Sequence, residues 1–215
     1  MSQVKDWEHT YKNKGIVQNE ILPTVQKAII TLKKNNCKKI LDLGCGTGRH
    51  TLFLAEHGFK VYAADISETA IKIVRQRSKE KGLGGIHYKI TDINNIDFED
   101  NFFDAILCVW STGHGLKRDV HNSVIEMHRI LKPSGFLLAD FMSIEDKNYG
   151  KGIILEENTF LHDFLDHPDV PHHYSSYQEV EEFLSLFTEK SIKKIEYDDP
   201  KYRGLIKAFW VEAKK

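Results

Sequence analysis

The segment ILDLGCGTGRHTLFLA, residues 40–55, constrains the fold of this chain more than any other stretch. Its apolar beginning predicts a buried strand, and residues 49–57 have the spacing of a short helix. Gly44, Gly46 and Gly48 lie between the two. Glycine allows a tight turn and a close approach of the backbone to a ligand. The segment therefore predicts a strand, a glycine turn and a helix whose free N–H groups border a binding site.

The rest of the chain alternates between segments typical of strands and segments typical of helices. An amphipathic helix is predicted over residues 20–35, and Ser67 is a suitable N-cap for a second helix that ends near Gly82. Further strands are predicted at 60–64, 87–90, 103–109, 136–141, 192–197 and 205–211, and further helices at 120–131 and 177–187. This alternation predicts an α/β protein in which helices cover both faces of a parallel sheet.

Length and charge narrow the class of partner. The chain has 215 residues, of which 41% are hydrophobic, and this is enough for a single domain over residues 1–215. The formal net charge of −1 gives no broad attraction for nucleic acid or anionic membranes, so a small-molecule partner is expected. The polar first twenty residues, and the lack of an apolar run of about 20 residues, predict a cytoplasmic protein without membrane segments. The oligomeric state stays open.

The three cysteines give no framework for cross-linking. Cys37, Cys45 and Cys108 form no CxxC pair, and their number is odd. We therefore expect free thiols in a reducing compartment, with neither disulfides nor a zinc site built from cysteine.

The spacing of the glycines separates several nucleotide-binding folds. A dinucleotide fingerprint has glycine at its first, third and sixth positions, which here hold Gly44, Gly46 and Arg49. The bulky Arg49 argues against a nicotinamide dehydrogenase. The phosphate-binding loop with Gly-Lys-Ser/Thr is also absent, because Gly48 is followed by Arg49 and His50. The turn is better suited to a ligand without phosphate groups.

With Asp42, the turn reads Asp-x-Gly-x-Gly-x-Gly, and it resembles the first motif of the class I S-adenosylmethionine-dependent methyltransferase superfamily, especially its small-molecule group with domains of type 11 or 25. The resemblance covers residues 40–141. It implies a Rossmann-like, doubly wound, seven-stranded and mostly parallel sheet in the order 3-2-1-4-5-7-6, with helices on both faces and an insertion before the last helix. It implies S-adenosylmethionine as cofactor and S-adenosylhomocysteine as product. The turn residues expected to bind the cofactor are Asp42, Gly44, Cys45, Gly46 and Gly48.

The resemblance also assigns cofactor contacts after the second and third strands. Asp65 is expected to hold the ribose hydroxyls, a role for which Ser67 leaves it free by capping the next helix. Ile66 is expected to pack on the adenine. Asp92 is expected to meet the adenine amino group, and the backbone of Ile93 to meet the ring.

Two further parts of the chain are expected near the cofactor. Cys108 and Trp110, at the end of the fourth strand, are expected to flank the methionine part and the methyl group. Tyr11, in an N-terminal cap segment over residues 1–19, is a candidate to cover the cofactor. Like the contacts above, these assignments follow from the resemblance.

The acceptor side of the site is predicted from residue type and position. Residues 143–175 lack clear periodicity but are too apolar for disorder, so we expect a substrate-side insertion there. His114 is the candidate catalytic residue, as a general base for an acceptor that arrives protonated. His172, His173 and Trp110 are candidate acceptor contacts. We expect no metal site, because the histidines lack a defined ligand spacing.

These patterns together predict a methyltransferase that acts on a small molecule. A methyltransferase for protein or nucleic acid stays open as an alternative, although the chain lacks the tetrapeptide [ND]PP[YFW] typical of amino-group methylation of bases. A regulatory module that binds the cofactor without catalysis also stays open, because intact cofactor motifs do not distinguish it from an enzyme.

Overall fold

The computed structural model describes residues 3–162, 164–165, 167–199 and 204–215. Its helices are α1 (Gln3–Lys14), α2 (Pro23–Lys34), α3 (Arg49–Glu56), α4 (Glu68–Glu80), α5 (Lys117–Ile130) and α6 (Tyr177–Phe183). Its strands are β1 (Lys39–Leu43), β2 (Lys60–Asp65), β3 (His87–Ile90), β4 (Phe103–Cys108), β5 (Leu131–Met142), β6 (Ile153–Glu156), β7 (Thr159–Leu161), β8 (His172–His173), β9 (Glu189–Asp199) and β10 (Gly204–Lys214).

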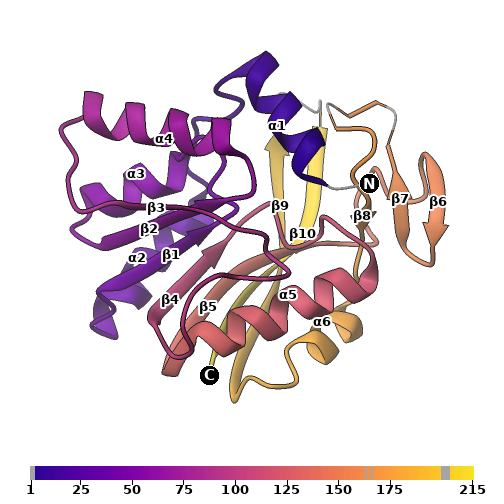
Figure 1. Ribbon diagram of the computed structural model, residues 1–215. Coiled ribbons are helices and arrows are strands. Elements are labelled where there is room, and N and C mark those ends of the chain that lie inside the picture. The colour runs from indigo at the N-terminus through magenta and orange to yellow at the C-terminus, as the bar shows by residue number, and fades with distance from the viewer. Residues whose placement is uncertain (1–2, 163, 166, 200–203) are drawn as a thin grey trace.

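Seven strands form the main sheet in the order β3-β2-β1-β4-β5-β10-β9 (Figure 1). The first five are parallel, and β10 runs antiparallel to both of its neighbours. This order confirms the predicted arrangement 3-2-1-4-5-7-6. The sheet order reverses at β1, which pairs with both β2 and β4, and open α/β sheets bind ligands at such a switch point.

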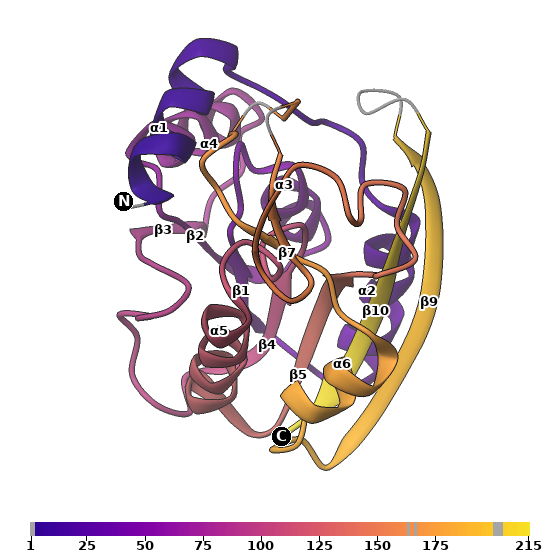
Figure 2. The ribbon, with the colours of Figure 1, turned by 90° about the vertical axis from the view of Figure 1, so that its right-hand side faces the viewer.

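Helices cover both faces of this sheet, as Figures 1 and 2 show. Buried residues of α5 and α6, such as Val124 and Val180, pack with Leu41 and its neighbours on one face. Buried residues of α2 and α3 pack with Ile40 on the other face, and α4 lies on that same side through Val74. The apolar clusters on the two faces bury the middle of the strands. The ends of the strands are where polar groups can form a site.

The predicted helix cap is present, whereas several predicted ends of helices and strands differ from the structure by a few residues. Ser67 caps α4, and its hydroxyl accepts a hydrogen bond from the Ala70 N–H at 3.1 Å, as predicted. The strand predicted over residues 136–141 begins earlier, because β5 starts at Leu131. The pairing of β4 with β5 jumps from Leu131 to Phe136, so the residues between them bulge out of the sheet.

Two segments without a predicted structure are ordered by contacts with distant parts of the chain. The N-terminal segment forms α1, which lies beside α4. The insertion forms a small sheet in the order β6-β7-β8 at one end of the molecule (Figure 1). A backbone bridge between His114 and His172 attaches this insertion to the loop that follows β4, and a bridge between Ser143 and Ser175 joins the two ends of the insertion.

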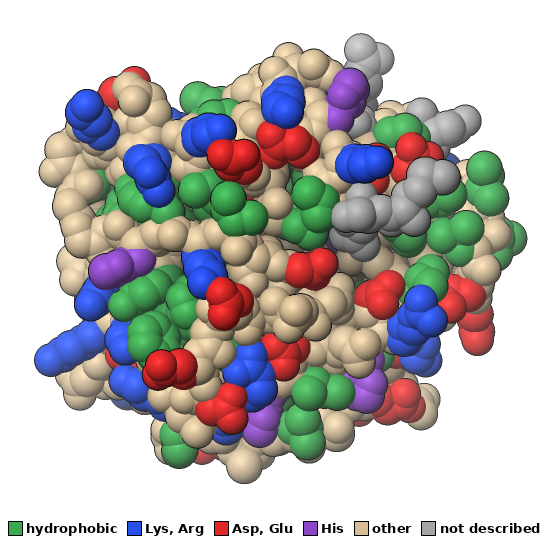
Figure 3. All heavy atoms as spheres, viewed as in Figure 1, with side chains coloured by type: hydrophobic (Ala, Val, Ile, Leu, Met, Phe, Trp, Pro, Cys, Tyr) green, Lys and Arg blue, Asp and Glu red, His purple; other side chains and the backbone are tan. Residues whose placement is uncertain are grey.

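The surface and the cysteines agree with the composition. On the face shown in Figure 3, acidic and basic side chains are interspersed. Cys37, Cys45 and Cys108 are buried free thiols. None of the helices in the described ranges has both the length and the apolar character that crossing a bilayer requires.

Candidate functional site

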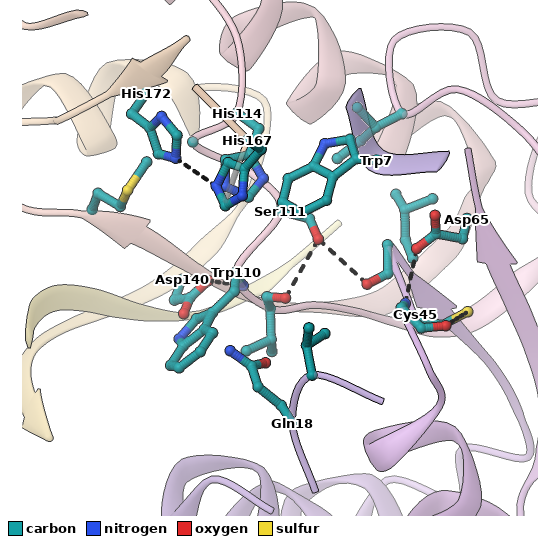
Figure 4. Close-up of a pocket in the computed structure, with 18 of the residues that line it drawn as sticks. Trp7, Gln18, Cys45, Asp65, Trp110, Ser111, His114, Asp140, His167 and His172 are labelled. Carbon is teal, nitrogen blue, oxygen red and sulfur yellow. Dashed lines mark hydrogen bonds between the residues drawn. The ribbon is translucent and has the colours of Figure 1, made fainter. Parts of the chain in front are cut away.

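A cavity lies at the carboxyl ends of the central strands, where the switch point predicts a ligand (Figure 4). Its wall combines the glycine turn, the loops after β2, β3, β4 and β5, the helix α1, the insertion and the strands β9 and β10. Of the predicted site residues, those on the wall are Tyr11, Gly44, Cys45, Gly46, Asp65, Ile66, Ile93, Trp110, His114 and His172.

The glycine turn is closed to side chains on the cavity side. Gly44 and Gly46 have φ angles of +67° and +52°, a conformation that L side chains rarely adopt. A Cβ atom on Gly44 would lie 2.6 Å from Ser111 Cβ, and one on Gly46 would lie 2.9 Å from Tyr11 Oη. The turn therefore presents bare backbone to the cavity.

The Gly44→Ala substitution is expected to lower cofactor affinity at least tenfold. The new methyl group adds left-handed strain of about 1–2 kcal/mol and displaces Ser111 into the cavity. Gly58→Ala is the matched control, since Gly58 also has a positive φ of +85° but has nothing within 4 Å of its Cβ position. Calorimetric titration with S-adenosylhomocysteine should show reduced affinity for Gly44→Ala alone. Equal affinities in the two variants would contradict the close-packed turn.

Asp65 lies at the end of β2 on the wall, and its carboxylate already accepts two backbone hydrogen bonds, so its contact with the ribose stays a prediction. Its Oδ2 atom accepts a hydrogen bond from the Gly46 N–H at 2.8 Å, and its Oδ1 atom accepts one from the Ser67 N–H at 2.9 Å. Burial raises the pKa of Asp65 to about 6, although these hydrogen bonds act to lower it. Each oxygen retains a second lone pair, so a ligand hydroxyl can still donate to it.

Three predicted cofactor residues lie behind the wall. Asp42 is buried, and its Oδ2 atom accepts a hydrogen bond from the Thr51 hydroxyl at 2.5 Å. Gly48 is the N-cap of α3 and packs against Val74. The buried Cys108 thiol accepts a hydrogen bond from the hydroxyl of Thr112 at 3.4 Å. From these positions they can shape the turn and the strand ends, whereas direct contact with a ligand stays a prediction.

The loop after β3 contributes Ile93 to the wall but places Asp92 elsewhere. Asp92 is exposed, and its Oδ1 atom accepts a hydrogen bond from the Asn94 N–H at 2.8 Å. This local turn is the reason why the carboxylate points away, because an Asx turn uses the side chain to hold its own backbone. Its contact with adenine stays a prediction.

The acceptor side of the wall holds an aromatic cluster. Trp110 has a φ of +58°, a strained angle for a bulky residue. Its backbone N–H donates a hydrogen bond to the buried Asp140 carboxylate at 2.8 Å. Its indole ring stacks on Tyr197 at 5.4 Å between ring centroids, and Arg49 lies over the ring at 4.6 Å. Asp140 itself also lines the cavity.

The histidines predicted for the acceptor side divide into two groups. His114 and His172 line the cavity together with His167, and Figure 4 draws the three close together, across the cavity from Asp65. His173 faces away, where its Nδ1 atom is 2.8 Å from the Thr159 hydroxyl and its Nε2 atom is 3.2 Å from a Glu179 oxygen. Neighbouring residues of a strand point to opposite sides, which explains the division.

Burial sets the charge state of the acidic and imidazole groups on the wall. It raises the pKa of Asp140 to about 7, against the opposing hydrogen bond from the Trp110 N–H. Burial also lowers the pKa of His114 to about 3, with a further contribution from His167. A neutral imidazole with so low a pKa is a weak general base near neutral pH. The role of His114 as a base therefore stays a prediction.

The wall offers polar atoms that a ligand could satisfy. Among the described residues, neither His50 Nε2 nor Trp110 Nε1 has a hydrogen-bond partner, although both atoms are buried and both residues line the cavity. Buried polar groups are nearly always hydrogen-bonded in proteins. These atoms, the bare glycine backbone and the strand-end carboxylate together fit a polar, non-phosphate ligand such as S-adenosylmethionine.

The helix α1 is held over the cavity by one carboxylate. Glu8 accepts hydrogen bonds from the Ser67 hydroxyl at 2.6 Å, the Thr69 hydroxyl at 2.6 Å and the Thr69 N–H at 3.1 Å. Partial burial raises the pKa of Glu8, but these bonds outweigh it and lower the pKa from 4.5 to about 2. A carboxylate at the N-terminus of α4 is also stabilised by the helix dipole.

The Glu8→Gln substitution is therefore expected to loosen α1 at neutral pH. Because the folded-state pKa lies below the unfolded value, the stabilisation is complete above about pH 4.5 and is lost as the pH falls toward about 2. Amide hydrogen exchange should be faster in α1 of the variant at pH 7, and the difference from the parent should shrink toward pH 3. Glu56→Gln, which breaks an exposed ion pair with Lys81, is the control. Unchanged exchange in α1 would contradict this docking role.

The comparisons with known proteins agree with this geometry. Residues 40–135 match a family model described as a methyltransferase domain. The ubiquinone biosynthesis O-methyltransferase of Rickettsia conorii is 28% identical over 168 residues, which cover 76% of this chain and 55% of that protein. The chain spans about half the length of the curated relatives it matches.

Two solved structures share the fold. A SAM-dependent methyltransferase from Methanosarcina mazei has a TM-score of 0.74 and 21% identity, over 91% of this chain and 98% of that chain. The 1,6-didemethyltoxoflavin-N1-methyltransferase of Burkholderia thailandensis has a TM-score of 0.71 and 18% identity, over 99% of this chain and 87% of that chain. That second structure contains 1,6-didemethyltoxoflavin and S-adenosylhomocysteine.

Proposed function

We propose that this chain, because it belongs to the class I S-adenosylmethionine-dependent methyltransferases, transfers a methyl group from S-adenosylmethionine to a small-molecule acceptor. One observation carries the proposal: the glycine turn and Asp65 line the same cavity as the aromatic and histidine side chains of the acceptor side. The names of two similar proteins, which refer to ubiquinone biosynthesis and to 1,6-didemethyltoxoflavin, support a small acceptor.

The donor half of the cavity would bind the cofactor through the residues of the switch point. The backbone of Gly44, Cys45 and Gly46 would receive the methionine part, since these residues line the cavity and both glycines lack a side chain. Asp65 would accept hydrogen bonds from the ribose hydroxyls. Ile66 and Ile93 would enclose the adenine, as apolar side chains on the same wall.

The acceptor half would position and desolvate the reacting atom. S-adenosylmethionine supplies an already activated methyl group, so orientation and the exclusion of water make up most of the protein's contribution. Trp110 is held by Asp140, Tyr197 and Arg49, and it forms a rigid wall. Trp7 and the helix α1 belong to the N-terminal cap segment, residues 1–19, and would close the cavity. Residues 143–175 would supply the acceptor contacts.

Methyl transfer is tested with purified protein and methyl-labelled S-adenosylmethionine. We expect calorimetric binding of S-adenosylmethionine but not of NAD. We further expect label transfer to at least one member of a panel of phenols, thiols and amines. Label found only on added protein or RNA would contradict a small acceptor. Binding without transfer to any acceptor would favour the regulatory module instead.

A further inference from the structure

Three histidines from separate segments meet in the acceptor half of the cavity. His114 follows β4, His167 lies in the insertion, and His172 begins β8. Each contributes one ring nitrogen to a group in which all three atoms lie within 4.8 Å of one another. His167 and His172 are buried, and His114 is partly buried. Such convergence of imidazoles is the donor set that Zn²⁺ and related transition metals prefer.

We propose that His114, His167 and His172 bind a divalent transition-metal ion, for which zinc is the best fit. Two zinc–nitrogen bonds of about 2.0–2.1 Å at a tetrahedral angle place their nitrogens about 3.3 Å apart. The Nε2 atoms of His167 and His172 are 3.2 Å apart. In the metal-free protein this distance also suits a hydrogen bond. When the ion binds, the proton of that bond would move to the other nitrogen of its ring, so that both Nε2 atoms present a lone pair.

The surrounding backbone holds the ligands in place before any ion arrives. The Gly115 N–H donates to Pro171 O at 2.9 Å, and the His173 N–H donates to Gly113 O at 2.9 Å, so two bonds flank the bridge between His114 and His172. The third histidine, His167, lies in a turn in which the Val170 N–H donates to His167 O at 3.1 Å. This turn brings His167 close to β8.

One ligand also has the outer partner typical of metal-binding histidines. The Nδ1 atom of His172 is 2.9 Å from the carbonyl oxygen of Val170. A carbonyl oxygen can only accept, so Nδ1 carries the proton and Nε2 presents its lone pair to the other two histidines. Trp7 packs against the cluster, at 4.9 Å from His114 and 4.3 Å from His167 between ring centroids.

Three protein ligands leave one position of a tetrahedral ion open. In known zinc enzymes this is the catalytic arrangement, whereas structural zinc sites have four protein ligands. All three histidines line the cavity, so a ligand in the cavity can reach that position. An acceptor hydroxyl, thiol or amine could occupy it; this consequence rests on the proposed methyl transfer, but metal binding does not.

The test is direct metal titration of the full chain in the absence of S-adenosylmethionine. After treatment with a chelator, Zn²⁺ should bind with a stoichiometry near one by calorimetry, and Co²⁺ should give the visible absorption of a tetrahedral site. His167→Gln and His172→Gln should each weaken Zn²⁺ binding at least tenfold. His173→Gln, a buried neighbour on the other side of β8, and the exposed His121→Gln should bind like the parent.

Two results would overturn the proposal. One is the absence of saturable Zn²⁺ and Co²⁺ binding in the parent chain. The other is parent-like affinity in both His167→Gln and His172→Gln. Far-UV circular dichroism of each variant shows whether it is folded. If a glutamine variant unfolds, His167→Asn and His172→Asn replace it in the same titration. Because no methyl donor is present, failure here leaves the proposed methyl transfer untouched.

Discussion

Replacing Asp65 by alanine is expected to weaken S-adenosylmethionine binding about tenfold to a hundredfold. A hydrogen bond to a charged group contributes about 1.5–3 kcal/mol, and each 1.4 kcal/mol is a factor of about ten in affinity. Asp65 is buried at the switch point and lines the cavity. Calorimetric titration measures the effect. Asp97→Asn, which breaks an exposed pair with Lys89, is expected to leave the affinity unchanged.

The same variant also removes an acceptor from the Gly46 and Ser67 N–H groups, so the ribose contact has to be separated from support of the loop. S-adenosylhomocysteine and its 2′,3′-dideoxy analogue provide that separation. A lost ribose contact weakens binding of the first ligand but has no effect on the second, which has no hydroxyls to hold. An equal loss for both ligands would contradict the ribose role and leave Asp65 as a support of the glycine turn.

The donor half of the site could be predicted from the sequence because its parts are local. A glycine turn, a strand-end carboxylate and the residues beside it occur at fixed distances along the chain. The strand order then brings those strand ends together without further information. Asp92 shows the limit of such motifs, since its carboxylate holds its own turn, and the motif does not distinguish this use from contact with a ligand.

The acceptor half could be predicted only in part, because its parts are distant in the sequence. Trp7, Trp110, His167 and Tyr197 come from four separate elements or loops, and only tertiary contacts place them on one wall. None of these segments has a spacing that indicates a shared site. The histidine cluster is the sharpest case, because its three ligands have no regular separation along the chain.

The two missed segments have a common physical reason. The helix α1 is polar, and its position depends on Glu8 reaching the N-terminus of α4 rather than on a buried apolar stripe. The strands of the insertion are two to four residues long, and β6 exposes Ile153 and Ile154. Such short strands have too few residues to show a period of two.

The His114→Ala substitution is expected to lower kcat about a hundredfold while cofactor affinity stays near that of the parent. His114 lies across the cavity from Asp65 (Figure 4). Loss of a group that positions one reactant can cost about that factor. Turnover is measured on whichever acceptor the panel identifies, and His121→Ala is the surface control. Unchanged turnover, or a loss of cofactor affinity as large as that of Asp65→Ala, would contradict this assignment.

A chelator distinguishes how His114 acts. With a pKa of about 3, His114 is neutral throughout the range from pH 5 to 8, so its own ionisation should leave no inflection in the pH profile of kcat there. If it acts as a metal ligand, the chelator lowers the parent to the level of His114→Ala and has no further effect on the variant. If it acts by direct contact with the acceptor, the chelator changes neither protein. The loss of kcat on chelation and the loss of kcat in His114→Ala are equal and non-additive only when the side chain acts through the metal. The comparison therefore distinguishes the two roles.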